Sequence, residues 1–232
     1  MTLAYRSGSV VTAGNASGGN LTLNRPTGTA DGDRLVVVVY FEPDTTTITI
    51  SPGTWESVAI ANTGAFKLQA FTKIAASEPT SYTIANSTAG NQWRAAVGAA
   101  YAGGTGTGTL IDVSATAQAD GVAITDQTAP SVTTTGPDRL VAFGYGNFSG
   151  NDGTATTGFC ANFRASFGGT ILADAALASA GATGTSRPSA GGIGSEIYAA
   201  LHAALISDLG VGAATSLPPP RPGHRQQHLL VR

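Results

Sequence analysis

Apolar and polar residues alternate along several segments of this chain, and this period of two constrains the fold more than any other feature of the sequence. Within residues 66–74, Phe66 and Leu68 fall on one side and Lys67 on the other. Residues 92–101 repeat the alternation with many Ala side chains. Successive side chains of a strand point to opposite faces, whereas a helical face repeats every 3.6 residues. Both segments are therefore predicted to be strands, and the small side chains of the second indicate a closely packed neighbouring sheet.

A continuous β-branched run, RLVVVVYFE at residues 34–42, predicts a central strand that is covered on both faces. Residues 195–210 are ambiguous, because their Ala and Leu content favours a helix while Ile197, Leu201 and Leu205 also fit the alternation. We assign this segment as a strand, since it completes an otherwise all-β chain. Further strands are predicted at residues 45–50, 81–85, 124–134, 139–148 and 170–177.

Turn-forming clusters separate these segments every ten to twenty residues, and helix-forming residues other than Ala are scarce. Such spacing is typical of β-sandwiches, which often reach 200–250 residues as one domain. We therefore predict an all-β fold, a single jelly-roll-like antiparallel β-sandwich over residues 1–217 with an extended C-terminal arm over residues 218–232.

The tetrapeptide DRLV occurs at residues 33–36 and again at residues 138–141, each time after a Gly-containing turn and before an apolar strand. A two-fold internal repeat, in which each half supplies corresponding strands to two facing sheets, explains this recurrence. A chance repetition of a turn-then-strand pattern explains it equally simply.

Composition excludes several classes of protein. Hydrophobic residues make up 42% of the chain, enough for a core, but no apolar run approaches the length of a membrane span. The N-terminal residues lack the basic and apolar regions of a secretory signal. The net charge of −2 gives no reason to expect nucleic acid as a partner. We expect no membrane insertion and no direct nucleic-acid binding.

The last fifteen residues differ from the rest of the chain. They hold 3 of the 12 basic residues and no carboxylate, so they carry a charge near +3 and the remainder a charge near −5. Their prolines favour polyproline II, in which fifteen residues at ~3.1 Å each reach roughly 45 Å. We predict a docking arm, with a frayed terminus as the alternative. Its expected contact residues are Pro218, Pro219, Pro220, Arg221, Pro222, Arg225, Leu229, Leu230 and Arg232.

Searches for catalytic patterns give little. The chain has no G-x-S-x-G or H-E-x-x-H sequence, and the glycine-rich residues 103–109 lack the spacing and the Lys of a phosphate loop. Its carboxylates are scattered, without the spacing of a calcium loop. His202 lies within a predicted strand and is interpreted as a half-buried structural residue, and Cys160 as a buried, inert thiol. We assign no catalytic, cofactor-binding or metal-binding residue and expect no enzyme.

Two aromatic residues are candidate ligand contacts. Trp55 follows a turn and Trp93 begins a strand, and an indole face packs well on a sugar ring. A core role is the more common one for Trp in such a fold. Glycan contact through Trp55 or Trp93 is therefore an expectation to be weighed against burial.

The order of several short motifs resembles a β-sandwich domain of bacteriophage virion structural proteins, which is also seen in some bacterial surface proteins. The matching residues span roughly residues 30–150, and the chain departs from the pattern in its C-terminal arm and in Thr54. The motifs stand here as Gly32-Asp33-Arg34-Leu35-Val36, Pro52-Gly53-Thr54-Trp55, Ser77-Glu78-Pro79-Thr80-Ser81-Tyr82, Ala99-Ala100-Tyr101-Ala102-Gly103, Ile111-Asp112 and Asp138-Arg139-Leu140-Val141.

This resemblance implies a structural protein of a phage tail or head exterior, located in the virion. The expected partners are other virion proteins and further copies of the same chain, reached through the body and the arm. The alternative is a carbohydrate-binding or adhesin module that contacts host cell-surface glycans. A hydrolase is disfavoured, because it requires a cleft that holds His202 or a pair of carboxylates.

Overall fold

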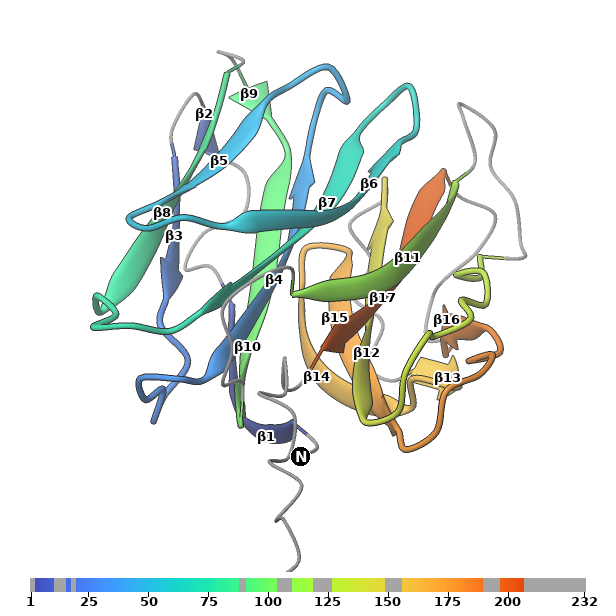
Figure 1. Ribbon diagram of the computed structural model, residues 1–232. Coiled ribbons are helices and arrows are strands. Elements are labelled where there is room, and N and C mark those ends of the chain that lie inside the picture. Colours follow the sequence, from blue (N-terminus) through green and yellow to red (C-terminus); the bar gives the residue numbers. More distant parts are fainter. Residues whose placement is uncertain are drawn as a thin grey trace, which may run out of the picture.

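The computed structural model describes residues 3–10, 16–17, 20–87, 91–103, 110–118, 127–148, 156–189 and 197–206. All regular structure in these ranges is β-strand, which confirms the all-β prediction (Figure 1). In the same ranges no helix is long and apolar enough to cross a membrane. The strands are β1 (Ala4–Val10), β2 (Ala16–Ser17), β3 (Leu21–Asn24), β4 (Arg34–Phe41), β5 (Ile48–Ser51), β6 (Glu56–Asn62), β7 (Lys67–Ile74), β8 (Ser81–Asn86), β9 (Asn91–Gln92), β10 (Arg94–Ala102), β11 (Ile111–Gln118), β12 (Arg139–Asn147), β13 (Thr156–Gly158), β14 (Asn162–Phe167), β15 (Thr170–Leu177), β16 (Ser186–Pro188) and β17 (Tyr198–Ile206).

Two five-stranded antiparallel sheets form the centre of the molecule (Figure 1). The first inner sheet has the order β1-β10-β4-β7-β6, and the second inner sheet has the order β11-β17-β12-β15-β14. A three-stranded sheet, β3-β8-β5, lies beside the first, and the two-stranded sheet β13-β16 lies beside the second.

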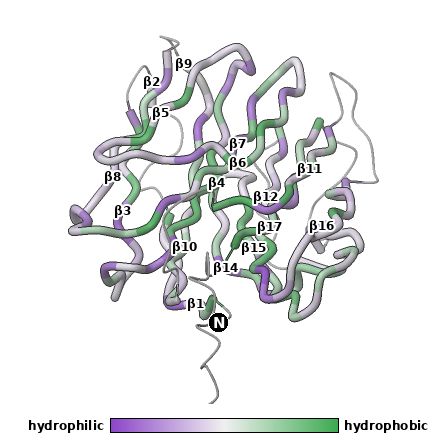
Figure 2. The backbone as a smooth tube through the Cα atoms, in the orientation of Figure 1, coloured by the Kyte–Doolittle hydropathy of each residue, from purple (hydrophilic) through white to green (hydrophobic). Residues whose placement is uncertain are grey.

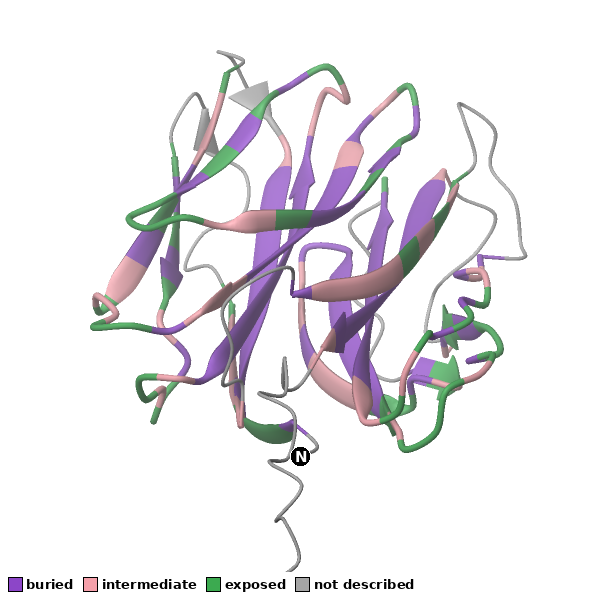
Figure 3. Ribbon diagram, viewed as in Figure 1, coloured by how far each residue is buried: buried purple, intermediate pink, exposed green. Residues whose placement is uncertain are grey.

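The two inner sheets pack against each other through one hydrophobic cluster. It joins Val36 and Val38 of β4 and Val97 of β10 to Leu172 of β15 and Leu201 of β17. Figure 2 shows the apolar residues concentrated along these central strands, and Figure 3 shows the same strands as the most continuously buried part of the molecule. The largest hydrophobic contribution to stability therefore comes from this contact between sheets.

The opposite face of each inner sheet is also covered. On β4, Leu35 and Val37 pack against the β3-β8-β5 sheet, so all eight residues of this strand are buried, as the sequence predicts. On β12, Phe143 and Tyr145 pack against residues 129–132 and Cys160. The molecule thus has four layers, with the two inner sheets in the middle.

The two halves of the chain repeat one topology. The first half also contains the short two-stranded sheet β2-β9, which is left out of the comparison because the described part of the second half has no counterpart to it. The other strands of the first half are, in chain order, β1, β3, β4, β5, β6, β7, β8 and β10. Those of the second half are β11, residues 129–133, β12, β13, β14, β15, β16 and β17. Numbered one to eight, both inner sheets then have the order 1-8-3-6-5, and both outer sets have the order 2-7-4. The internal repeat of corresponding strands in two facing sheets is therefore present in the structure.

Strand register repeats as well as strand order. Val38 pairs with Val97 in the first inner sheet, and at the same place Gly144 pairs with Leu201 in the second. Irregularities in pairing also recur, between Tyr5 and Ser7, Ser57 and Ala59, Ile111 and Val113, and Phe163 and Ala165. Bulges at equivalent points of edge strands indicate one unit built twice rather than two unrelated ones.

The DRLV repeat is one residue out of step with this structural repeat. In the first inner sheet Arg34 pairs with Tyr101. The equivalent pair in the second inner sheet is Leu140 with Leu205, so Arg34 corresponds to Leu140 and not to Arg139. A shift of one residue turns every side chain to the other face of a sheet. Arg34 accordingly points between the inner sheets and Arg139 away from them. The tetrapeptide therefore marks equivalent strands but not equivalent side chains.

Glycines on β12 allow the two central strands to approach. A Cβ on Gly144 would lie 3.1 Å from Val38 and 3.0 Å from Leu201. A Cβ on Gly146 would lie 3.1 Å from the Tyr40 ring. Small residues on one strand thus face large ones on the other, which lets the duplicated sheets interdigitate despite their common topology.

Most predicted central strands are confirmed, with their ends shifted by a few residues. They are those at residues 34–42, 66–74, 81–85, 92–101, 139–148 and 170–177. The strand predicted at residues 195–210 is confirmed over its described part, as β17. The strand predicted at residues 45–50 begins later, at Ile48. The strand predicted at residues 124–134 is wrong over its described part, where only isolated pairings at Ala129 and Thr133 occur. Pro130 lies between them and has no N–H to donate to a ladder.

A close approach of β1 to β14 provides a stability test. A Cβ on Gly8 would lie 2.9 Å from the carbonyl oxygen of Arg164, which is backbone and cannot rotate away. Gly8→Ala is therefore expected to lower the free energy of unfolding by about 1–3 kcal/mol. Ser114, at the equivalent place on β11, donates its hydroxyl to Val58 O at 3.0 Å. Ser114→Ala should cost less than about 1 kcal/mol. Urea denaturation measures both variants, and equal losses would contradict the packing argument.

Candidate functional site

Asp174 forms the centre of a buried polar cluster between the inner sheets. It lies on β15 with 1% of its surface exposed. Its carboxylate accepts hydrogen bonds from the Tyr101 hydroxyl at 2.8 Å and from Arg164 Nη2 at 2.9 Å. The Arg164 guanidinium also lies 4.0 Å from the centre of the Tyr5 ring. Because Tyr5 and Tyr101 come from the first inner sheet, the cluster joins both halves of the chain.

The cluster changes the acidity of its members. Burial, followed by the charge and hydrogen bond of Asp174, raises the pKa of Tyr101 well above its usual value. Burial lowers the pKa of Arg164, but the hydrogen bond and charge of Asp174 outweigh this effect and the net shift is upward. Tyr101 therefore stays neutral and Arg164 stays charged. The cluster thus holds the two inner sheets together through a charged hydrogen-bonded pair and a neutral phenol.

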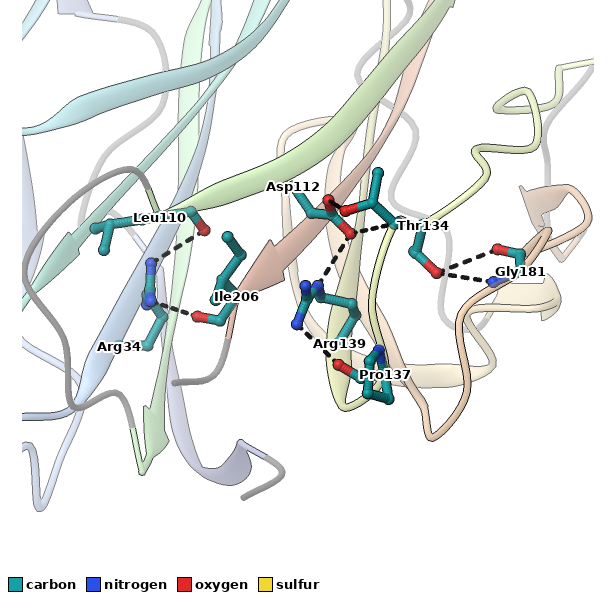
Figure 4. A network of polar contacts seen from close by, with 9 residues as sticks. Arg34, Leu110, Asp112, Thr134, Pro137, Arg139, Gly181 and Ile206 are labelled. Atoms are coloured by element: carbon teal, nitrogen blue, oxygen red, sulfur yellow. Dashed lines mark hydrogen bonds and ion pairs between the residues drawn. The ribbon is translucent and has the colours of Figure 1, made fainter. Parts of the chain in front are cut away.

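Arg34 makes a second bridge between the halves (Figure 4). It is 1% exposed and donates from Nη2 to the carbonyl of Ile206 at 2.6 Å and from Nη1 to that of Leu110 at 3.4 Å. Burial lowers the pKa of Arg34 to about 10, although the charge of Glu56 opposes this change. Arg34 is therefore still protonated at neutral pH, and its charge faces the carbonyl oxygens of Ile206, at the end of β17, and of Leu110, just before β11.

Asp112 and Arg139 form an ion pair on the other side of the second inner sheet, with Nε 2.9 Å from Oδ2 (Figure 4). Asp112 also accepts a hydrogen bond from the N–H of Thr135 at 2.9 Å. Burial alone raises the pKa of Asp112, but the bonds from Thr135 and the charge of Arg139 outweigh it and lower the pKa. This pair fixes the turn before β12 against the edge strand β11.

The two tryptophans do not form a common platform. Trp55 is half-buried and its ring meets the Tyr82 ring edge-on at 5.2 Å, with Lys73 Nζ 5.5 Å from its centre. Trp93 is also half-buried and donates its indole N–H to Gly168 O at 3.1 Å. Lys73, which contacts Trp55, pairs with Leu35 at the start of β4. Trp93 is next to Arg94, which pairs with Phe41 at the end of β4. The two rings therefore lie at opposite ends of one strand.

His202 is more deeply buried than the sequence suggests, with 0% of its surface exposed rather than half. Its Nδ1 donates to Pro130 O at 2.8 Å, and Nε2 has no partner. Burial lowers the pKa of His202 to about 4, against a weaker opposing effect of the Pro130 bond. Cys160 is buried as predicted, and burial raises the pKa of its thiol to about 12. Both groups are neutral at physiological pH.

The remaining sequence candidates are a metal site, the glycine-rich loop and the docking arm. Among the described residues, no group of three or more His, Cys, Asp or Glu side chains is placed to hold a metal ion. The glycine-rich residues 104–109 and the whole predicted docking arm, residues 218–232, lie outside the described residues.

Sequence reasoning missed the cluster around Asp174. A signal was present, because Asp174 is the one charged residue of the predicted strand at residues 170–177 and shares a face with Leu172. A carboxylate on the apolar face of a strand requires a buried partner. The partners themselves, Tyr101 and Arg164, depend on how the sheets face each other.

Comparison of the chain with models of protein families, with curated proteins and with solved structures finds no match.

Proposed function

We propose that this protein is a structural component of a bacteriophage particle, located in the tail or on the head exterior. It assembles with other virion proteins and with copies of itself through its β body and its C-terminal arm. We further assign each half of the chain to the jelly-roll-like sandwiches. The strand orders 1-8-3-6 and 2-7-4 support this assignment, and jelly rolls are common in viral capsid and lectin domains.

The observation that carries this proposal is the use of the buried ionisable groups. Asp33 pairs with Arg6 at 2.7 Å, Arg34 and Asp174 bridge the inner sheets, and His202 bonds to a backbone carbonyl. Charged groups that serve chemistry usually face a cleft, where burial and neighbours adjust their pKa values. Here Arg34, Asp174 and His202 stabilise contacts between layers, and the Arg6–Asp33 pair ties β1 to the turn before β4. Such a rigid body suits a role that depends on surface complementarity rather than on a reaction.

Deletion of residues 218–232 tests the proposal. The truncated chain is expected to keep the thermal unfolding of the full chain, because no described contact involves the arm, but to enter particles at least about tenfold less, a loss of roughly 1.4 kcal/mol in binding. Incorporation is measured by quantifying the protein in purified particles.

Charge variants of the arm supply the control. Replacement of Arg221, Arg225 and Arg232 by Lys keeps the charge near +3 and should preserve incorporation, whereas replacement of the same residues by Glu should abolish it. Normal incorporation of the truncated chain would refute the docking role of the arm.

A further inference from the structure

A groove crosses the outer face of the second half of the chain. It has a volume of about 340 Å³ and is lined by Thr128, Thr157, Gly158, Thr185 and Arg187. This size lies near the lower end of the range of about 300–1,000 Å³ that is usual for small-molecule sites. The groove lies on the side of the β13-β16 pair that faces away from the core, because Thr156, Ser186 and Pro188 point inward and are buried.

Strand pairing places a cation between two hydroxyl groups in this groove. Thr157 of β13 pairs with Arg187 of β16. The antiparallel bridge between Ala129 and Ser186 puts Thr128 opposite Arg187 on the other side. Neighbouring strands lie about 4.8 Å apart, so Thr128, Arg187 and Thr157 form a row roughly 10 Å long. Thr185 contributes a third hydroxyl beside this row.

Gly158 lines the groove and packs tightly against the backbone of the segment that carries Thr185. Its φ of 89° lies in the left-handed region, and a Cβ there would be 2.2 Å from the carbonyl oxygen of Thr185. Other residues are therefore excluded at this position. Arg187 is exposed, and no carboxylate within the described part of the chain forms an ion pair with it. Its guanidinium can present two parallel N–H groups to an anion.

The first half of the chain shows what the same fold looks like without these features. The central strand of each outer set gives the correspondence between the halves. Ile84 of β8 pairs with Leu21 and Ile50. Ser186 of β16 pairs with Ala129 and Gly158 in the same way. The equivalents of Thr157 and Thr185 are then Thr49 and Thr83. Arg187 corresponds to Ala85 and Gly158 to Ile50. The hydroxyls of Thr157 and Thr185 thus have counterparts in the first half, where Asn20 takes the place of Thr128. The guanidinium and the glycine that lines the groove occur in the second half alone.

We propose that this groove binds an anionic saccharide. Arg187 pairs with the acidic group of the sugar, and the hydroxyls of Thr128, Thr157 and Thr185 exchange hydrogen bonds with its hydroxyls. A ligand with one anion among many hydroxyl groups matches a lining that has one cation among three hydroxyls. This site differs from the two tryptophans and does not depend on the assembly role proposed above.

Titration of the full chain with named sugars tests the site. The probes are 3′-sialyllactose and trigalacturonate as carboxylate saccharides, glucose 6-phosphate as a phosphate saccharide, lactose as a neutral saccharide and inorganic phosphate as a plain anion. Binding is followed by calorimetry and ligand-observed NMR at low salt. At least one acidic saccharide is expected to bind about tenfold or more tightly than lactose, because a charged hydrogen bond is worth at least that factor. It should also bind more tightly than inorganic phosphate, which lacks the sugar hydroxyls that the three threonines contact. The preferred probe shows whether the acidic group is a carboxylate or a phosphate.

Variants connect any binding to the groove. Arg187→Ala should weaken binding of the preferred saccharide about tenfold or more, and Thr157→Ala by a smaller factor. Thr49→Ala, at the equivalent place in the first half, is the matched control and should leave binding unchanged. All three positions are exposed, so thermal unfolding should stay unchanged. No binding of any acidic saccharide, equal binding of inorganic phosphate, or an unaffected Arg187→Ala variant would each overturn the proposal.

Discussion

Asp174→Asn is expected to lower the free energy of unfolding by about 3–5 kcal/mol, because it leaves the Arg164 guanidinium facing a neutral amide between the two inner sheets. The carboxylate of Asp174 is 2% exposed and also accepts the Tyr101 hydroxyl. The amide keeps the shape of the side chain, so the loss reports on charge rather than on packing. Urea denaturation at neutral pH measures the change.

Two control variants separate this effect from ordinary polar substitutions. Arg6→Gln removes the ion pair between Arg6 and Asp33. Because the Arg6 side chain is 39% exposed, this variant should lower the free energy of unfolding by less than about 1 kcal/mol. Tyr101→Phe removes one hydrogen bond from the cluster and should cost about 0.5–1.5 kcal/mol beyond any change in packing. A loss in Asp174→Asn no larger than that in Arg6→Gln would show that the cluster does not hold the sheets together.

The central strands were predictable from the sequence because burial on both faces leaves a strong local signal. The run at residues 34–42 is apolar without interruption, and β4 is covered by a sheet on each side. The edge strands gave weaker signals. β11 alternates half-buried and exposed residues, and its Ser, Thr and Ala side chains fit a strand or a loop equally well.

The duplication was visible in the sequence only as a fragment. DRLV marks the start of β4 and of β12, but the two copies point their arginines to opposite faces. Residues of the two halves are structurally equivalent when they occupy the same place in the strand pairing, as Val38 and Gly144 do. Residues at such positions differ because they pack against each other across the pair of inner sheets. Packing between two copies therefore removed the similarity that a sequence repeat requires.

The saccharide groove could not be foreseen, because its lining comes from three segments that meet through strand pairing. Thr128 and Arg187 are brought together by the bridge at Ala129, in a segment that the sequence predicted as a longer strand. Threonine is so frequent in this chain that no single Thr stands out. Only the pairing of β13 with β16 selects Thr157 as a neighbour of Arg187.

Stability is expected to fall as the pH drops from 6.5 towards 4, because His202 is buried in its neutral form. Burial lowers its pKa to about 4 in the folded protein, whereas in the unfolded chain the imidazole has its ordinary pKa of 6.5. Between these values the unfolded state binds a proton that the folded state does not, so the free energy of unfolding decreases by about 1.4 kcal/mol per pH unit. Above pH 6.5 this histidine contributes no pH dependence, and below pH 4 its contribution is constant.

His202→Asn removes the titrating group while its side-chain amide can still donate to Pro130 O in place of Nδ1. The variant is expected to be less stable at every pH because of the lost volume, but its stability should no longer depend on pH between 6.5 and 5. Within that window Asp112 and Glu78, whose pKa values are lowered, stay ionised and do not contribute. His224→Gln combined with His228→Gln is the matched control, since it removes the other two histidines and should retain the slope of the parent chain. Urea denaturation at half-unit pH intervals distinguishes the two cases, and a slope that persists in His202→Asn would assign the acid sensitivity to another group.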